Sequence, residues 1–257
     1  MFTNTARIDG FGAQYQNIIS DIMYALEHNG EYIHTHPNFE EIYEDEALEL
    51  TNAMNVKSGY RSIHDLSPED RKCVNIIGRG SSYPNFERKM EIYLKSPEMD
   101  KIRELFTTNN KNPFDQDKTH VAVHIRRCST HKNIDLTSHH GGIDIKNAPV
   151  DSLHTLSTRF LPDSYYLSII NEIRINNKNV LFHIYSEGKE EDFSNFVSED
   201  TVLHINKTVI DTFTALVHAD ILVTSPSSFS YCAAFLSKGT VYAKIFWHKN
   251  ASFWISR

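Results

Sequence analysis

The stretch that decides the fold is DTFTALVHADILVTSPSSFSYCAAFLSKGTVYAKIFW, residues 211–247. Apolar residues recur at helical spacing in DTFTALVHA and SSFSYCAAFL, whereas DILVTS and TVYAKIFW are short and nearly all apolar, as buried strands are. Asp211 is expected to cap the first helix, and Gly239 to close the second. Helix, strand, helix and strand in succession predict a parallel sheet.

The same alternation extends back to residue 120. The segments HVAVHI (120–125), VLFHIYS (180–186) and TVLHIN (201–206) predict strands, and helices are expected at 161–177 and 190–199. Because the strands are nearly all apolar, we expect helices on both faces of the sheet, which describes a doubly wound α/β domain. Ligands of such a domain bind at the carboxyl ends of its strands.

The first half of the chain predicts a smaller α/β region. Residues 8–30 indicate a glycine-bearing loop and an amphipathic helix ended by Gly30, and EYIHT (31–35) predicts a strand. NNKNPFDQDK (109–118) has the composition of a connector, and its DQD is expected to be solvated linker because it precedes a strand. The predicted domains are therefore 1–115 and 116–257.

Composition and charge exclude several classes of protein. The chain has 257 residues, 40% of them hydrophobic, and a net charge of −7, which argues against a general nucleic-acid binder. No apolar run is long enough to span a membrane, the N-terminus lacks the apolar core of a signal peptide, and three scattered cysteines favour a reducing compartment. We therefore expect a cytoplasmic protein that holds any anion locally.

Two arginines end the first strand of the second half. Arg126 and Arg127 follow HVAVHI, and a guanidinium group matches phosphate oxygens bidentately. Since neighbouring residues of a strand point to opposite faces, we expect only Arg126, which shares its face with His124, to reach a ligand. The alternative is that both arginines pair with surface carboxylates.

A serine-rich segment follows a later strand. Ser225, Ser227 and Ser228 precede an apolar helix, so hydroxyl groups, backbone N–H groups and the helix dipole favour an anion there. One serine is enough for a structural cap, and four occur within residues 225–230, which favours phosphate.

Other polar residues at strands have two open interpretations. Ser186 and Glu187 end one strand and either contact a ribose or base or cap the helix that follows. His124, His183 and His204 lie within apolar strands and are expected to be hydrogen-bonded core or edge residues. No histidines have the spacing of metal ligands on a predicted helix or strand.

Three segments together resemble a known family. The three segments are GFGAQ (10–14), VHIRR (123–127) and 211–236, and the two glycines of the first are expected to precede the first helix. In this order along the chain they resemble the GDP-fucose-dependent fucosyltransferases of the α1,2, α1,6 and protein O-fucosyl groups. The resemblance implies a GT-B fold, in which two Rossmann-like domains face a central cleft. It also implies a metal-independent, inverting transferase that needs no cofactor beyond its nucleotide-sugar donor and acts on a glycan acceptor.

The resemblance also implies roles for individual residues. Arg126 would grip the donor pyrophosphate and stabilise the departing nucleotide, with Arg127 in support. The remaining donor contacts implied are Gly10, Gly12, Gln14, His124, His183, Ser186, Glu187, Ser225, Ser227, Ser228 and Phe229. The base for the acceptor hydroxyl is expected in the polar stretch 128–152, where Asp135 and Asp144 are the candidates.

The chain departs from the family pattern at two places. Ala13 stands where the family's loop has asparagine, and CSTHK (128–132) follows the arginines where an acidic residue is common. Another donor such as UDP-xylose and an inactive nucleotide-sugar-binding protein therefore remain alternatives. A phosphatase would require Cys128 as nucleophile, but the C-x5-R phosphate cradle is absent.

Overall fold

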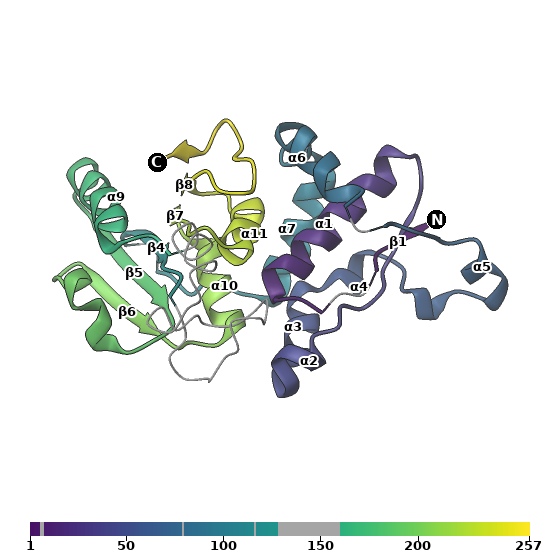
Figure 1. Ribbon diagram of the computed structural model, residues 1–257, viewed down its shortest axis with the longest axis horizontal. Coiled ribbons are helices and arrows are strands. Elements are labelled where there is room, and N and C mark those ends of the chain that lie inside the picture. The colour runs from purple at the N-terminus through teal and green to yellow at the C-terminus, as the bar shows by residue number, and fades with distance from the viewer. Residues whose placement is uncertain (6–7, 79, 116, 128–159) are drawn as a thin grey trace, which may run out of the picture. The chain divides into compact units, whose positions relative to one another are not determined.

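The computed structural model describes residues 1–5, 8–78, 80–115, 117–127 and 160–257 (Figure 1). It divides the chain into two compact units, unit 1 (Met1–Lys111) and unit 2 (Asn112–Arg257). This division falls inside the segment 109–118 that composition predicted as a connector, slightly before the predicted boundary after residue 115. Asp135 and Asp144, the two candidate bases, and Cys128 lie outside the described residues.

The described part of unit 1 contains a small parallel sheet with helices packed around it. Its strands are very short and pair in the order β2-β1-β3. They are β1 (Phe2–Thr3), β2 (Tyr32–Ile33) and β3 (Asn75–Ile76). The helical elements described are α1 (Phe11–Glu27), α2 (Glu40–Tyr43), η1 (Glu44–Glu46), α3 (Ala47–Met54), α4 (Val56–Gly59), η2 (Ile63–Asp65), α5 (Pro68–Lys72), α6 (Ser82–Tyr93) and α7 (Pro97–Asn109).

Helix α1 is the central helix of unit 1. Its predicted apolar face is buried at Tyr15, Ile18, Ile19 and Ile22, whereas Leu26 is 45% exposed. The expectation that Gly12 belongs to a loop before this helix is wrong, because α1 begins at Phe11. The helix starts two residues before Ala13, because the carbonyl oxygen of Gly10, the N-cap residue, accepts the first helical hydrogen bond from the N–H of Gln14.

Unit 2 contains a larger sheet, and every strand pair among its described residues is parallel. The strand order is β6-β5-β4-β7-β8-β9. Numbered along unit 2, this is the order 3-2-1-4-5-6 of a Rossmann-like doubly wound sheet. The strands are β4 (Thr119–His124), β5 (Val180–Ser186), β6 (Thr201–Ile205), β7 (Ile221–Val223), β8 (Thr240–Ala243) and β9 (Ile255–Ser256).

Helices cover both faces of this sheet, as predicted (Figure 1). On one face, α9 (Asp163–Asn176) buries Tyr166, Ile169, Ile170 and Ile173 against apolar side chains of β4 and β5. On the other face lie α10 (Val209–His218) and α11 (Ser228–Leu236), and the His124 ring of β4 contacts the Phe229 ring of α11. The short helix η3 (Glu190–Phe196) links β5 to β6. The α/β class with parallel sheets is therefore confirmed.

Two predicted helix ends are wrong in detail. Thr208, not Asp211, caps α10, since its side chain accepts from the backbone N–H of Asp211. Helix α11 ends at Leu236, three residues before Gly239. Gly239 is required for another reason: a Cβ atom there would lie 2.4 Å from the carbonyl oxygen of Ala219. Within the described ranges, no helix combines the length and the apolar character that crossing a bilayer demands.

Candidate functional site

The candidate site lies at the carboxyl ends of β4 and β7, the two central strands of the unit 2 sheet. Strand order reverses between them, because β4 leads outward to β5 and β6 and β7 leads to β8 and β9. Helices leave such a pair of strands toward opposite faces, which opens a crevice at their carboxyl ends. The arginine motif follows β4 and the serine-rich segment follows β7, so the fold brings both predicted motifs to this point.

Ser225 joins the two strand ends. Its hydroxyl donates to the carbonyl oxygen of His124 at 2.5 Å and accepts from the backbone N–H of Arg126 at 2.8 Å. Tyr166 of α9 lies 3.0 Å from the same oxygen, and Ser230 completes the turn by accepting from the Ser225 N–H. Ser225 is 1% exposed, and its hydrogen bonds to His124 and Arg126 hold the backbone of the site in place.

Arg126 contacts the start of α11 through its side chain. Its Nη1 donates to the Ser227 hydroxyl at 3.0 Å, and that hydroxyl also accepts from the backbone N–H of Phe229 as the N-cap of the helix. A guanidinium group is thereby held beside a helix N-terminus, where N–H groups of the first turn lack intrahelical partners. The guanidinium group and the helix N-terminus both produce positive potential at the start of α11, which favours the binding of an anion there.

The partly exposed residues of this turn are Ser228 and Phe229. The Ser228 hydroxyl makes no hydrogen bond to the described residues, whereas those of Ser225 and Ser230 both donate and accept within the protein. The Ser227 hydroxyl accepts two bonds and keeps its own O–H for a further acceptor. The hydroxyl groups of Ser227 and Ser228 can therefore donate to a ligand, and Ser225 and Ser230 hold the turn.

His124 has an incomplete hydrogen-bond set within the described residues. Its Nδ1 atom is buried and has no partner among the described residues. Burial, together with the positive charge of Arg126, lowers the pKa of His124 to about 3. A buried polar atom without a partner is uncommon in native structures, and a bound ligand group is one way to satisfy it.

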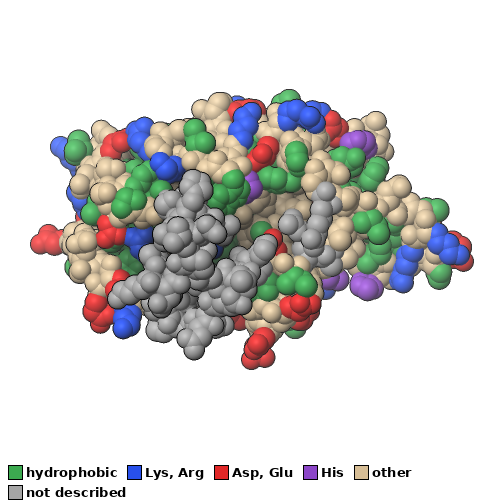
Figure 2. Space-filling view, viewed as in Figure 1, with side chains coloured by type: hydrophobic (Ala, Val, Ile, Leu, Met, Phe, Trp, Pro, Cys, Tyr) green, Lys and Arg blue, Asp and Glu red, His purple; other side chains and the backbone are tan. Residues whose placement is uncertain are grey.

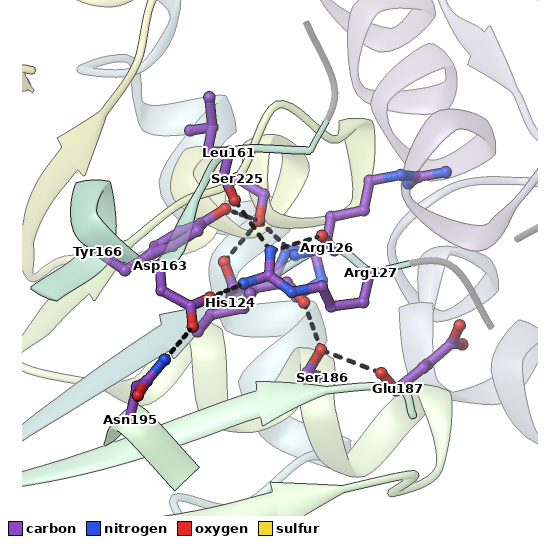
Figure 3. A network of polar contacts seen from close by, with 11 residues as sticks. His124, Arg126, Arg127, Leu161, Asp163, Tyr166, Ser186, Glu187, Asn195 and Ser225 are labelled. Carbon is purple, nitrogen blue, oxygen red and sulfur yellow. Dashed lines mark hydrogen bonds and ion pairs between the residues drawn. The ribbon is translucent and has the colours of Figure 1, made fainter. Parts of the chain in front are cut away.

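Arg127 points away from Arg126, as Figure 3 shows. Its guanidinium pairs with Asp163 at the start of α9 and donates to the carbonyl oxygen of Leu161 at 3.0 Å. Asp163 also accepts from Asn195 of η3 at 3.0 Å. The neighbouring arginines thus separate as strand alternation predicts, and Arg127 anchors α9 and η3 beside the site.

The end of β5 lies next to the end of β4. The Ser186 hydroxyl donates to the carbonyl oxygen of Ile125 at 2.6 Å, and the exposed Glu187 side chain points away from that bond (Figure 3). Gly188 has φ of 131°, a conformation that side chains rarely adopt, and its N–H donates to Asn206 at 3.0 Å. Neither Ser186 nor Glu187 caps η3, whose N-cap residue is Lys189.

The structure does not bring His183 to this edge. It lies in the middle of β5, and its ring nitrogens are bonded to His120 and His204 at 2.9 and 3.0 Å. The expectation of hydrogen-bonded strand histidines is met for His183 and His204. Asp115 and Asp117 of the DQD segment are exposed, as expected of a solvated linker, and Asp115 also accepts from the His120 ring at 3.0 Å. A histidine in each of three neighbouring strands was the available signal for this cluster.

The remaining predicted donor contacts belong to unit 1. Gly10 is the N-cap residue of α1 and Gly12 is buried within it. Gln14 is 3% exposed, and its amide nitrogen donates to the carbonyl oxygens of Asp9 and Asn38, both at 2.8 Å. These bonds give Gln14 a role in holding the Asp9 loop against the segment before α2.

Charge is distributed unevenly over the described surface. Figure 2 shows acidic side chains gathered over α2, where Glu40 and Glu41 precede the acidic turn Glu44–Glu46. Arg126 and Arg127, by contrast, are half-buried at the strand end. No group of three His, Cys, Asp or Glu side chains in the described ranges has the arrangement of a metal site.

No protein-family model matches the chain, and no curated protein matches it. Among solved structures, it is similar to NodZ alpha-1,6-fucosyltransferase soaked with GDP-fucose, with a TM-score of 0.46, 10% identity and 92% of each chain covered; NodZ has been solved from Bradyrhizobium.

A mutant of Arabidopsis thaliana FUT1 in complex with GDP gives a TM-score of 0.43, 8% identity and coverage of 98% of this chain and 72% of that chain. POFUT1 in complex with GDP-fucose gives a TM-score of 0.34 and 14% identity, with 93% of this chain and 69% of that chain covered. At these identities and TM-scores the similarity assigns no activity to the chain.

Proposed function

We propose that this protein is a metal-independent, inverting glycosyltransferase that moves a sugar from a nucleotide-sugar donor to a glycan hydroxyl. GDP-fucose is the donor we favour, because the arginine and serine motifs resemble those of fucosyltransferases. The observation that supports the proposal most is the contact between Arg126, at the end of β4, and Ser227, at the start of α11.

We assign a diphosphate to that contact. Arg126 supplies a fixed positive charge, the first turn of α11 supplies N–H groups, and Ser228 supplies a hydroxyl that makes no bond to the described residues. Ser225 holds the backbone of His124 and Arg126 in place before any ligand binds. A preorganised cation and helix N-terminus stabilise a dianionic group without costly rearrangement.

The same groups suit the chemistry of sugar transfer. As the bond between the anomeric carbon and the donor phosphate breaks, negative charge grows on the leaving diphosphate. Donors placed where charge develops lower the barrier, and the loss of one such donor typically costs about 100-fold or more in rate. Arg126 is the catalytic residue of this proposal, and its charge takes the part that a divalent cation plays in metal-dependent transferases.

His124 adds a neutral hydrogen-bonding group beside this charge. Its lowered pKa keeps the imidazole uncharged at neutral pH, so Nδ1 can accept or donate one hydrogen bond without repelling Arg126. We assign this atom to the bound donor. Glu187 and Gly188, at the end of the adjacent strand, are the expected contacts of its nucleoside part.

A donor screen in the presence of EDTA tests the proposal. A ligand at 100 times its Kd stabilises the fold by about 2.7 kcal/mol, so the rise in melting temperature ranks the nucleotides by affinity. We expect GDP or GDP-fucose to raise the melting temperature more than UDP or UDP-xylose. Released nucleotide, measured with glycan acceptors, then reports transfer.

The outcomes of this screen are distinct. Binding without nucleotide release in any acceptor mixture would indicate a nucleotide-sugar-binding protein without turnover. Preference for UDP sugars would mean that the donor is a UDP sugar bound at the same site. Absence of binding to every nucleotide, or binding only when a divalent metal is added, would contradict the proposal. Arg126→Ala is the matched negative control, since it removes the positive charge but leaves the Ser225 bonds to the backbone.

A further inference from the structure

The loop between β8 and β9 carries two exposed aromatic side chains. Its sequence is KIFWHKNASFW, residues 244–254, in which Trp247 is 47% exposed and Phe253 is 49% exposed. Every other Trp, Tyr and Phe side chain that the structure describes is buried or half-buried. Large apolar groups gathered on one exposed segment indicate a binding surface. We refer to residues 244–254 as the aromatic loop.

The aromatic loop lies at the same edge of the sheet as the candidate site. It leaves β8 after Ala243 and returns to β9, whose Ser256 pairs with Ala243. Since β8 is parallel to β7 and β7 is parallel to β4, the loop starts at the carboxyl edge, where the candidate site also lies. In Figure 1 it is the yellow segment between β8 and the C-terminus. Compact surface loops with neighbouring ends are frequently functional.

Tyr231 of α11 anchors the aromatic loop. Its ring stacks on the His248 ring with centroids 4.8 Å apart. The rings of Phe246 and Trp254 make T-shaped contacts with it at 5.4 and 5.5 Å. The backbone N–H of Tyr231 donates to the carbonyl oxygen of Ser227 at 3.0 Å, so this anchor lies one helical turn from the candidate site.

Hydrogen bonds hold the aromatic loop closed. The Asn250 side-chain amide donates to the carbonyl oxygen of Ala243 at 3.2 Å and to the hydroxyl of Ser256 at 3.3 Å, which joins the two ends of the loop. The Tyr231 hydroxyl donates to the carbonyl oxygen of Lys249 near the middle of the loop. A loop whose shape is fixed in advance loses little conformational entropy when it binds a ligand.

The orientation of each exposed ring is set by an aromatic neighbour. The Trp247 ring contacts those of Phe246 and His248, with centroids 4.6 and 5.8 Å apart. The Phe253 ring makes a T-shaped contact with the buried Trp254 ring at 6.4 Å. The aromatic loop therefore presents two oriented rings to solvent.

The chemistry of the aromatic loop matches a sugar. A pyranose has C–H groups on its faces and hydroxyl groups around its rim, and the positively polarised C–H groups are attracted to the negative face of an aromatic ring. The exposed polar side chains of Lys249 and Ser252 lie between the aromatic residues along the chain and can bond to hydroxyl groups. Aromatic rings with a few polar groups are the usual lining of small-ligand sites. A stable protein partner takes roughly 20–30 residues from each side, more than this loop offers.

We propose that the aromatic loop binds the glycan acceptor, with a pyranose ring stacked on Trp247 and with Phe253 as a second contact for the same oligosaccharide. This inference rests on the proposed function, because an acceptor hydroxyl must reach the donor held at the same edge of the sheet. It adds the kind of acceptor, an oligosaccharide that presents a C–H face to an aromatic ring.

A glycan array without any donor tests the aromatic loop by itself. The full chain is applied to immobilised oligosaccharides built from glucose, galactose, mannose, xylose, fucose and N-acetylglucosamine. We expect the wild type to bind a subset, and Trp247→Leu, which stays apolar but lacks a ring, to bind the same glycans about 10-fold more weakly. Trp247→Phe keeps a ring and should bind within ~3-fold of the wild type. Ile175→Ala, which removes an 82% exposed side chain of α9, is the matched control and should bind like the wild type.

Tryptophan fluorescence reports which ring the glycan covers. The chain has two tryptophans, and Trp254 is 5% exposed, so Trp254→Phe leaves Trp247 as the reporter. A glycan that binds on the array should shift the emission of this variant to the blue, because the sugar displaces water from the ring. If Trp254→Phe does not fold, iodide quenching of the wild type decides, and the glycan should protect the exposed tryptophan.

Failure of this inference and failure of the proposed function give different results. If no nucleotide binds but glycans bind in a Trp247-dependent way, the transferase is wrong and the sugar-binding surface stands. If nucleotides bind but no glycan does, or Trp247→Leu binds glycans like the wild type, the inference is overturned and the transferase stands. Binding to phosphatidylglycerol vesicles, or dimer formation, that Trp247→Leu abolishes in place of glycan binding would also overturn it.

Discussion

The candidate site and the histidine row, in which His120, His183 and His204 are hydrogen-bonded in series across β4, β5 and β6, lie on the same face of one sheet. Their hydrogen bonds are completed to different degrees. In the row, both ring nitrogens of His120 and of His183 have partners within the protein. In the site, the buried Nδ1 atom of His124 has none among the described residues. A polar cluster that satisfies itself stabilises the fold, whereas one left incomplete is available to a ligand.

The two arginines after β4 contact different kinds of group. Arg127 is paired with Asp163 and a backbone carbonyl, which ties α9 to the end of β4. Arg126 contacts a neutral hydroxyl at a helix N-terminus, where a further anion is favoured. Each of the following predictions tests the difference between the completed cluster and the incomplete one.

The largest effect is expected for Arg126→Ala. The rate of sugar transfer should fall at least ~100-fold, because the substitution removes a preorganised cation from the leaving diphosphate. The free energy of unfolding, measured with urea, should change little, since the backbone bonds to Ser225 remain. Near-wild-type transfer would show that the site is not the one that handles the diphosphate.

The next effect is a loss of stability in acid from the histidine row. The pKa of His183 is about 4 in the fold and about 6.5 when unfolded, so the unfolded chain binds more protons between these values. The contribution of His183 is complete above pH 6.5 and is lost as pH falls toward 4, by about 2 kcal/mol at pH 5 and about 3 kcal/mol at pH 4.

Urea unfolding of the wild type and His183→Phe at pH 7.5 and pH 5 measures this term. The variant should lose less stability between the two pH values than the wild type. Equal losses would mean that the row is not the acid-sensitive element, and that other histidines with lowered pKa, such as His34, account for the change.

Arg127→Ala is expected to cost about 1.5 kcal/mol of unfolding free energy, because it leaves partly buried Asp163 without its charged partner. Transfer should fall less than in Arg126→Ala, as its effect on the site is indirect. Arg61→Ala, which removes an exposed pair with Glu31, is the matched control and should change stability little. A larger loss of rate than in Arg126→Ala would reverse the assigned roles.

The smallest effect is expected for His124→Phe. Donor affinity, measured by calorimetry, should weaken about 10-fold, which corresponds to one hydrogen bond of about 1.4 kcal/mol. Stability should hold or rise, because the ring contact with Phe229 persists while a buried nitrogen without a partner is removed. Unchanged affinity together with reduced stability would place His124 with the completed clusters.

Much of unit 2 could be predicted from the sequence because its signals are local. Nearly all-apolar strands separated by amphipathic helices identified the parallel sheet, and strand alternation predicted that Arg126 and Arg127 point apart. In unit 1 the strands have only two residues each, too short for a pattern, and the glycine loop was misplaced by the early start of α1.

The sequence by itself determined which residue types end each strand, since composition and period are written along the chain. Only the tertiary structure decided which of them meet. Arg126 and Ser227 are 101 residues apart, and His120 and His183 are 63 apart, so no local pattern records those bonds. Strand order decides which residues bond, because β4 lies between β5 and β7. Residues of β4 therefore meet those of β5 on one side and those that follow β7 on the other. That is why the family resemblance implied a donor contact for His183, whereas the structure bonds its ring to two histidines.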